Sequence, residues 1–325
     1  DAVVQALDAM TGELVWETPV ADYQAGYYMT MAPLVASGKV MVGASGGERG
    51  IRGFVAAFDP DTGDEIWRSH TVPGPGEPGN ETWPGDTWKT GGASIWITGS
   101  YDPELNLTYW GTGNPGPWIG DQRPGDNLYT NSVIALAVDT GETLWRYDYQ
   151  TTYRDDFGFD EGPRSVPVVA DGRVFTFGAQ GQLHAVDFET GAGIWQVDTH
   201  ERYGVRKGFF GAAGSPLVED GRVIVNVGGQ RGGIVAFDAR TGDELWTSTS
   251  DEASYSSAVG ATFGGLRHAL FFTRTGLVGV DPSSGTVLFQ HRWRSRLGAS
   301  VNAATPLVVG DRVFISSSYG TGAVL

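Results

Sequence analysis

The 325-residue sequence predicts an all-β protein, a β-propeller of four-stranded antiparallel blades, and a recurring phrase carries the prediction. The phrase is an aspartate or a stand-in for it, three residues, a glycine, three residues and an aromatic ring. Most copies follow one another at roughly fifty residues or slightly less, which is the length of one blade. A unit of that size cannot bury its own apolar face, so neighbouring units must stack. The copies end at Trp16, Trp67, Trp145, Trp195, Trp246 and Phe289.

The residues around each copy favour short strands. Alternating apolar stretches such as Val3–Leu7 and Gly233–Phe237 precede the turn and are typical of strands. Thr-Gly then makes the turn, because glycine accepts positive φ and the aspartate and threonine side chains bond to nearby backbone groups. Further strands are expected at Val166–Val169 and Arg173–Phe177. About six to eight such blades with regular docking tryptophans fit a propeller. A β-sandwich would leave the regular tryptophan unexplained.

Composition excludes several classes of function. The formal net charge of −16 argues against a nucleic-acid partner. No apolar run is long enough to cross a membrane. The absence of cysteine excludes disulfides, thiolate metal sites and an attached c-type haem in this segment.

The ends of the chain lie within expected strands. Because the sequence opens at Asp1 and stops at Leu325 inside such strands, we expect one propeller domain over residues 1–325 that is truncated at both ends. The alternative is that the two ends pair and close a ring, which would cover two exposed sheet edges.

The third repeat is longer than its neighbours. The interval from Gly63 to Gly141 is about half again as long as the others, and insertions in propellers fall in loops of one face, commonly the functional one. The added sequence is rich in Gly, Pro and Trp. It contains the strings W-K-x-G-G-x-x-x-W from Trp88, Y-D-P-E-L-N-L-x-Y from Tyr101, G-T-G-N-P-x-P-W from Gly111 and R-P-G-D-N-L-Y from Arg123.

In these strings the chain resembles the pyrroloquinoline quinone (PQQ)-dependent alcohol dehydrogenases, a family of eight-bladed periplasmic propellers. The resemblance is strong from about residue 30 to residue 150, and residues 165–325 look like generic PQQ-like repeats, which also occur in non-catalytic scaffolds. It implies that a tryptophan lies beneath the flat quinone, and the matching ring is Trp96.

The resemblance also assigns a cation site. The family's glutamate and asparagine ligands fall on Glu48 and Asn114, and oxygen ligands of this kind suit calcium or a lanthanide. The cation would polarise the quinone carbonyl. Thr30 and Ser45 match positions that bind the family's cofactor, and the two glycines that follow Ser45, Gly46 and Gly47, are counted with them.

The catalytic base is the point where this chain departs from the family. An alignment from Trp145 puts Asp156 at the position of the carboxylate that takes the alcohol proton. An alignment from Gln150 puts Gly158 there instead and retains Asp160 as an additional metal ligand. Ala179 occupies the position expected to hold a basic residue near the quinone.

Two hypotheses follow from these residues. The first is an extracytoplasmic, periplasmic enzyme that oxidises an alcohol by hydride transfer to metal-bound PQQ and passes electrons to a separate acceptor such as a cytochrome c. The second is a non-catalytic PQQ-like propeller that binds other proteins of the bacterial envelope, and the altered base region and the generic later repeats motivate it.

Overall fold

The structure, a computed structural model, describes residues 2–154, 164–206, 208, 211–298 and 300–325. These residues divide into two compact units, one ending at Gln150 and one formed by the described residues from Thr151 to Leu325. That the whole chain is a single propeller domain stays a prediction. No helix among the described residues combines the length and the apolar composition needed to cross a membrane.

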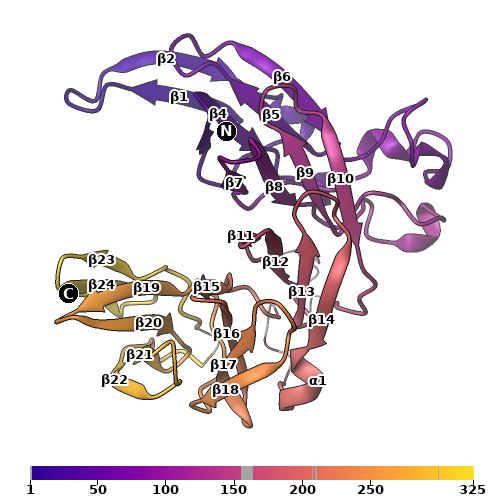
Figure 1. Cartoon of the computed structure of the whole chain (residues 1–325). Coiled ribbons are helices and arrows are strands. Elements are labelled where there is room, and N and C mark those ends of the chain that lie inside the picture. Colours follow the sequence, from indigo (N-terminus) through magenta and orange to yellow (C-terminus); the bar gives the residue numbers. More distant parts are fainter. Residues whose placement is uncertain (1, 155–163, 207, 209–210, 299) are drawn as a thin grey trace. The chain divides into compact units, whose positions relative to one another are not determined.

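The first unit consists of three antiparallel sheets whose strands follow one another in chain order (Figure 1). A two-stranded sheet is followed by two four-stranded sheets, here called blades. The strands are β1 (Val3–Leu7) and β2 (Leu14–Pro19), then β3 (Leu34–Ala36), β4 (Lys39–Gly43), β5 (Phe54–Phe58) and β6 (Glu65–His70), then β7 (Ser100–Asp102), β8 (Leu107–Gly111), β9 (Ser132–Ala137) and β10 (Thr143–Asp148). Short 3-10 turns lie in the connections: η1 (Tyr23–Ala25), η2 (Gly47–Arg49), η3 (Asn80–Thr82), η4 (Thr87–Thr90) and η5 (Gly120–Gln122).

The second unit has three four-stranded blades and a final three-stranded sheet. Its strands are β11 (Val168–Ala170), β12 (Arg173–Phe177), β13 (Gln182–Asp187), β14 (Gly193–Asp198), β15 (Leu217–Glu219), β16 (Arg222–Gly229), β17 (Gly232–Asp238), β18 (Glu244–Ser248), β19 (Val259–Phe263), β20 (Leu266–Phe272), β21 (Gly276–Val280), β22 (Val287–Arg292), β23 (Leu307–Val309), β24 (Arg312–Ser317) and β25 (Gly322–Val324). One detail differs from the sequence prediction, which foresaw no helix: α1 (Thr199–Tyr203) follows β14 and is capped by the Asp198 side chain.

The recurring phrase has the predicted local structure and a tertiary role. Oδ1 of Asp59 accepts hydrogen bonds from the backbone N–H groups of Asp61 and Thr62, both at 2.9 Å. Gly63 closes the turn with φ +75°, and a Cβ there would lie 2.6 Å from the ring of Trp16. Gly141, Gly242 and Gly285 likewise have positive φ and lie against the rings of Trp67, Trp195 and Trp246, so these glycines serve both the turn and the docked ring.

The docked rings are also held by hydrogen bonds. Nε1 of Trp67 donates to the backbone oxygen of Val138 at 2.9 Å, in the turn of the next blade. In the second unit, Nε1 of Trp246 donates to the backbone oxygen of Pro282 at 3.1 Å. This docking explains the regular tryptophan on which the propeller prediction depended.

The core lies between stacked sheets, so both faces of an inner strand are buried. In β5, Phe54, Ala56 and Phe58 pack against the side of the first sheet, while Val55 and Ala57 pack with Ile134 and Leu136 of the next blade. Side chains alternate between the two faces of a strand. All five residues of β5 are therefore buried.

Strand order decides where the connections lie. In an antiparallel sheet of consecutive strands, the connection between the second and third strands and the one leading to the next blade fall at the same end. The Asp-Gly turns fall at the opposite end. In the first unit, the connections at the end opposite the Asp-Gly turns are segments 20–33, 44–53, 71–99 and 112–131.

Candidate functional site

The described residues of the predicted site all lie in those four connections of the first unit. Thr30 is in segment 20–33, Ser45 to Glu48 in segment 44–53, Trp96 in segment 71–99 and Asn114 in segment 112–131. Asp156, Gly158 and Asp160 lie outside the described residues. Both registers for the catalytic base therefore stay open.

Backbone pairing brings the first two segments together. Ser45 donates its N–H to the oxygen of Tyr28 at 2.8 Å, and Tyr28 donates to the oxygen of Ser45 at 3.3 Å. This antiparallel bridge leaves Oγ1 of Thr30 2.9 Å from Oγ of Ser45. Thr30 Oγ1 also donates to the backbone oxygen of Trp96 at 3.0 Å. The structure therefore unites three of the predicted residues.

The direction of this relay follows from the hydroxyl groups. Each hydroxyl carries a single hydrogen. Since Thr30 gives its hydrogen to the carbonyl of Trp96, Ser45 is the donor to Thr30. Ser45 is buried and Thr30 is exposed. Thr30 is thus the member that an incoming ligand can reach, and Ser45 supports it from behind.

Glycines allow the connections to approach one another. Gly46 has φ +113°, and a Cβ on it would lie 2.2 Å from the backbone oxygen of Gly26. A Cβ on Gly47 would lie 3.1 Å from Oγ of the buried Ser94. The turn predicted to bind the cofactor is therefore packed against the segment that leads to Trp96.

Asn114 lies in the fourth connection, segment 112–131, which contacts the second and the third. The N–H of Ala93 donates to the Asn114 backbone oxygen at 2.9 Å, and Gly92 and Pro115 form an antiparallel bridge. A Cβ on Gly116 would lie 3.1 Å from the oxygen of Gly47. Asn114 is 3% exposed. The segments that carry Glu48, Trp96 and Asn114 are therefore in mutual contact.

Glu48 is exposed and its contacts fall on one oxygen. Oε1 accepts a hydrogen bond of 2.6 Å from the hydroxyl of Tyr28, and Nε of Arg49 lies 3.8 Å from the same atom. The guanidinium of Arg49 also lies over the Tyr28 ring, 5.2 Å from its centre. Sequence reasoning missed Tyr28, although it is two residues before Thr30 and extended chain alternates faces with that period.

Trp96 has the chemistry to contact a quinone, and Glu48 and Asn114 have the oxygen atoms to bind a hard cation. Nε1 of the half-buried Trp96 is itself buried and has no hydrogen-bond partner among the described residues, which costs about 1–3 kcal/mol until an acceptor reaches it. Glu48 and Asn114 offer oxygen donors, the kind that calcium prefers. The part of the chain that the structure describes contains no cluster of three or more His, Cys, Asp or Glu side chains.

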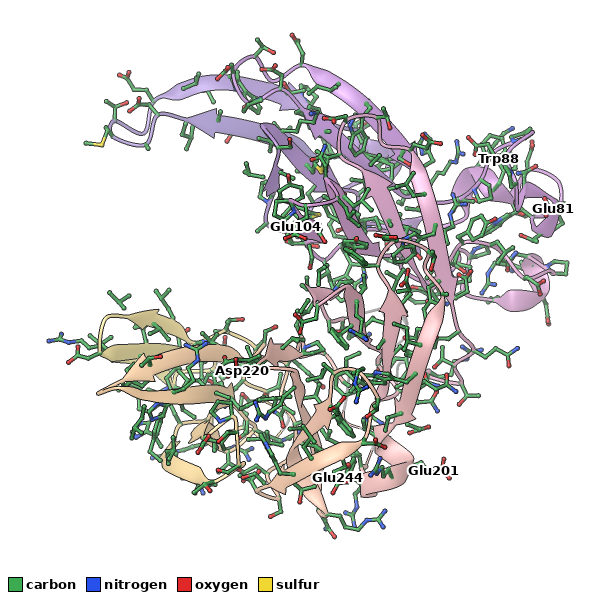
Figure 2. The ribbon with its side chains drawn as sticks, viewed as in Figure 1. Glu81, Trp88, Glu104, Glu201, Asp220 and Glu244 are labelled. Carbon is green, nitrogen blue, oxygen red and sulfur yellow. The ribbon has the colours of Figure 1, made fainter. Side chains whose placement is uncertain are left out.

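Arg52 anchors the inserted segment to the turn that carries Glu48. Its Nε donates to the backbone oxygen of Val72 at 2.8 Å, and its guanidinium lies 4.8 Å from the centre of the Trp88 ring. Burial lowers the pKa of Arg52, with partial compensation by Glu77. Figure 2 shows Trp88 on the segment that extends from the blades of the first unit. Sequence reasoning also missed Arg52.

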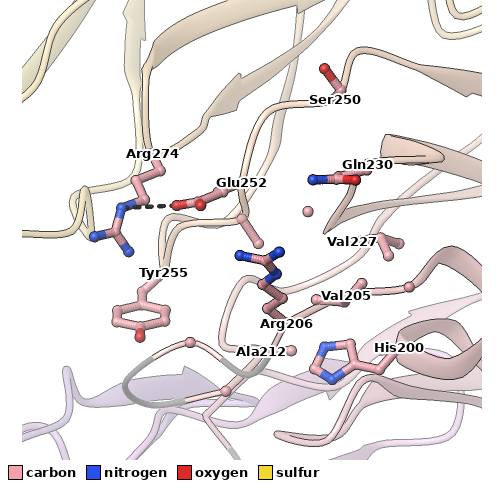
Figure 3. Close-up of a pocket in the computed structure, with 15 residues that line it drawn as sticks. His200, Val205, Arg206, Ala212, Val227, Gln230, Ser250, Glu252, Tyr255 and Arg274 are labelled. Carbon is pink, nitrogen blue, oxygen red and sulfur yellow. Dashed lines mark ion pairs between the residues drawn. The ribbon is translucent and has the colours of Figure 1, made fainter.

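The second unit contains a separate hollow of about 670 Å³ (Figure 3). Its walls come from α1 and the segment after it, and from the connections β16–β17, β18–β19 and β20–β21. In the order of strands within a blade, these correspond to the connections that carry the first unit's site residues. An ion pair between Glu252 and Arg274, 3.2 Å long, crosses one side, and Arg206 extends into the hollow (Figure 3). Of the predicted site residues that the structure describes, none lines it. Ala179 is buried behind this lining: its oxygen accepts from the N–H of Ala212, which lines the hollow, at 2.8 Å.

Comparisons with known proteins support the sequence reading. A family model described as "Outer membrane protein assembly factor BamB" matches residues 130–324, and one described as "Glucose/ethanol/alcohol dehydrogenase, beta-propeller domain" matches residues 17–164. The two matched ranges overlap over residues 130–164. The division into dehydrogenase-like residues 30–150 and generic repeats from residue 165 stays a prediction.

Several curated proteins are similar to about half of the chain. The quinoprotein alcohol dehydrogenase PedH of Pseudomonas putida is 43% identical over 176 residues, which are 49% of this chain and 29% of that protein. The lanthanide-dependent methanol dehydrogenase of Methylacidiphilum fumariolicum is 41% identical over 180 residues, again 49% of this chain and 29% of that protein. The matches thus span under a third of each relative.

Solved structures extend the likeness to nearly the whole chain. A europium-containing methanol dehydrogenase matches with a TM-score of 0.76 and 27% identity over 99% of this chain and 71% of the other. BamB from Moraxella catarrhalis matches with a TM-score of 0.57 and 16% identity over 99% of this chain and 87% of the other, a likeness of fold alone. The predicted fold class, an all-β propeller of four-stranded blades, is confirmed.

Fold and repeats define a propeller of the quinoprotein class. The chain belongs to the family of PQQ-dependent alcohol dehydrogenases and their relatives built from PQQ-like β-propeller repeats.

Proposed function

We propose that this chain is the cofactor-holding part of a quinoprotein dehydrogenase that binds PQQ with calcium or a lanthanide and oxidises an alcohol. The observation that carries the proposal is the convergence of Thr30, Ser45 and Trp96 in one hydrogen-bonded relay. The segments that carry Glu48 and Asn114 both pack against the segment that leads to Trp96. When bound, PQQ would supply a two-electron acceptor and the cation a Lewis acid.

Each residue has a role that its surroundings allow. Thr30, the exposed end of the relay, would bond to a carboxylate of the cofactor while Ser45 continues to donate to it. The half-buried indole of Trp96 would offer a rigid aromatic surface. Glu48 and Asn114 would supply oxygen ligands to the cation. Asp160 is the candidate for another ligand, and Asp156 is the candidate to accept the proton of the alcohol.

Partners and location follow from the same proposal. The substrate would be a small alcohol, and electrons would pass to a separate acceptor such as a cytochrome c. One similar protein, from Methylorubrum extorquens, is named methanol dehydrogenase [cytochrome c] subunit 1, and it supports that choice of acceptor. We place the protein in the periplasm or another extracytoplasmic compartment.

Titration with PQQ tests the proposal directly. We expect quenching of tryptophan fluorescence at micromolar PQQ in the presence of Ca²⁺ or La³⁺, and alcohol-dependent reduction of a dye by the loaded protein. Trp96→Phe should retain the fold and weaken PQQ binding. A chain that binds no PQQ at these concentrations, with either cation, refutes the proposed function.

A second candidate is a protein-binding scaffold of the bacterial envelope. The family model described by the name BamB, which covers residues 130–324, favours it. The PQQ titration distinguishes the two candidates, because a scaffold should show neither PQQ binding nor turnover. Quinone-dependent alcohol oxidation by the purified chain would rule it out.

A further inference from the structure

The hollow in the second unit contains an arginine without an acidic partner. Arg206 extends into it from the segment after α1 (Figure 3). Among the described residues, none forms a hydrogen bond or an ion pair with its guanidinium. Acidic residues outnumber basic ones in this chain by 38 to 22, so a shortage of carboxylates does not explain the missing partner. The side chain is exposed, and a ligand that enters the hollow can therefore reach it.

The other charged groups of the described lining cancel. Nε of Arg274 lies 3.2 Å from Oε2 of Glu252, and Nη2 of Arg274 also donates to the backbone oxygen of Gly298. Burial lowers the pKa of His200 below its usual value, so its imidazole is neutral at neutral pH. The described residues around the hollow thus have one net positive charge, that of Arg206.

Packing between the connections forms the walls without a ligand. A Cβ on Gly228 would lie 2.2 Å from the backbone nitrogen of Ala253, so the β16–β17 and β18–β19 connections touch. The N–H of Arg274 donates to the backbone oxygen of Glu252 at 3.1 Å, which joins the β20–β21 connection to them. The volume of about 670 Å³ falls within the range of about 300–1,000 Å³ that is typical of small-molecule sites.

The uncharged side chains of the lining favour a polar ligand. Gln230, Ser250 and Tyr255 have groups that donate hydrogen bonds to hydroxyls and accept them. The apolar side chains are small, namely Val205, Ala212, Val227 and Ala253. A ligand with several hydroxyl groups would find hydrogen-bond partners here, whereas a large apolar ligand would bury little surface.

A guanidinium binds a carboxylate through two parallel hydrogen bonds, which gives both strength and orientation. A single net positive charge suits a monoanion, and the carboxylate of Glu252 opposes a second negative charge. We propose that the hollow binds a hydroxylated monocarboxylic acid, such as a sugar acid, with Arg206 as the residue that holds its carboxylate. This inference does not depend on the proposed function.

Calorimetric titration of the chain, without PQQ and without added cations, tests the inference. The probes share one carbon chain: gluconate is a monoanion, sorbitol is neutral and sorbitol 6-phosphate is a dianion. We expect gluconate to bind about tenfold more tightly than sorbitol, because a charge-assisted hydrogen bond is added. Sorbitol 6-phosphate should bind more weakly than gluconate. The inference is overturned if gluconate fails to bind at millimolar concentration, or binds no more tightly than either of the other probes.

Substitution of two arginines locates the binding. Arg206→Gln removes the charge and should reduce the affinity for gluconate to that for sorbitol. Arg240 provides the control, because it lies in the turn between β17 and β18, at the opposite end of the same blade. Arg240→Gln should keep the affinity of the unsubstituted chain. Full affinity in Arg206→Gln, or an equal loss in the control, shows that the carboxylate binds elsewhere.

Arg206→Lys tests the charge in a variant that keeps it. The ammonium lacks the planar fork, so gluconate should bind more weakly than to the unsubstituted chain but still more tightly than sorbitol. Circular dichroism verifies that both Arg206 variants are folded. If a folded Arg206→Lys chain no longer prefers gluconate to sorbitol, the positive charge is not what selects the ligand.

A titration in the presence of PQQ distinguishes this site from the proposed quinone site. We expect the affinity for gluconate to be unchanged by PQQ. Competition between the two that disappears in Arg206→Gln would mean that the hollow receives the carboxylates of the quinone, and it would overturn the inference. A chain that binds gluconate but no PQQ refutes the proposed function and leaves the inference standing.

Discussion

Replacement of Gly46 by alanine should disorganise the candidate site more than it disturbs the rest of the first unit. Gly46 has φ +113°, a backbone conformation that side-chain-bearing residues rarely adopt, and a Cβ would lie 2.2 Å from the oxygen of Gly26. The backbone strain costs about 1–3 kcal/mol. The close contact forces two connections apart at a further cost of about 1–3 kcal/mol.

Gly38 supplies the control within the same blade. Its φ of +70° is also positive, but a Cβ on it would meet nothing within 4 Å. Gly38→Ala should therefore cost only the backbone strain, about 1–2 kcal/mol. The difference between the two variants isolates the effect of crowding at the site.

Hydrogen exchange measured by mass spectrometry is the suitable assay, because a chain of two compact units need not unfold in one step. In Gly46→Ala, the peptides that contain Tyr28 and Ser45 should lose protection, since the hydrogen bonds between these residues depend on the turn. The same peptides should be unaffected in Gly38→Ala. If the two variants lose equal protection there, close packing at Gly46 does not hold the site together.

Three further predictions concern docking, the hydroxyl relay and acid stability. Trp67→Phe removes the bond to Val138 and should lower the unfolding free energy of the first unit by about 0.5–1.5 kcal/mol, measured in urea. Thr30→Val should weaken PQQ binding about tenfold and Ser45→Ala by less, in fluorescence titrations, because a hydrogen bond to a charged group contributes about 1.5–3 kcal/mol and Thr30 is at the exposed end; a larger effect at Ser45 contradicts that order. Burial lowers the pKa of His184 from 6.5 to about 4, so the stability of the second unit should be full above pH 6.5 and fall by about 3 kcal/mol as the pH drops through 4. His184→Gln should flatten that decline in pH-dependent unfolding, and an unchanged decline would contradict it.

The repeat could be predicted from the sequence because its determinants are local. Where the copy has its aspartate, that residue and the glycine act within four residues of each other, so the turn at Asp59 and Gly63 is specified by nearby residues. The strands predicted at Val3–Leu7 and Arg173–Phe177 have those bounds in the structure. What the phrase alone leaves unspecified is the partner of each tryptophan, because Trp67 bonds to Val138, which is 71 residues away.

The site could be predicted only as far as the long sequence strings reach. The family resemblance that rests on them identified Thr30, Ser45 and Trp96, which the structure brings together. The strings themselves contain only Trp96 of these three. They gave no indication of Tyr28, whose importance depends on a backbone bridge to Ser45, or of Arg52, whose contacts lie in another connection. The hollow in the second unit was missed for the same reason. Its walls come from connections of different repeats, and no single stretch of sequence contains them.

The two ends of a blade are held by different kinds of contact. At the end with the Asp-Gly turns, every copy has nearly the same structure, because one docked ring and one tight turn suffice to join neighbouring sheets. At the other end, connections of unequal length must be held by particular contacts. Arg52 is an example, since it joins segment 44–53 to Val72 and Trp88 in the inserted segment. Sequence can therefore vary at this end without loss of the docking contacts at the other. That separation allows one kind of repeat to occur in the two families of protein, dehydrogenases and assembly factors, whose models match this chain.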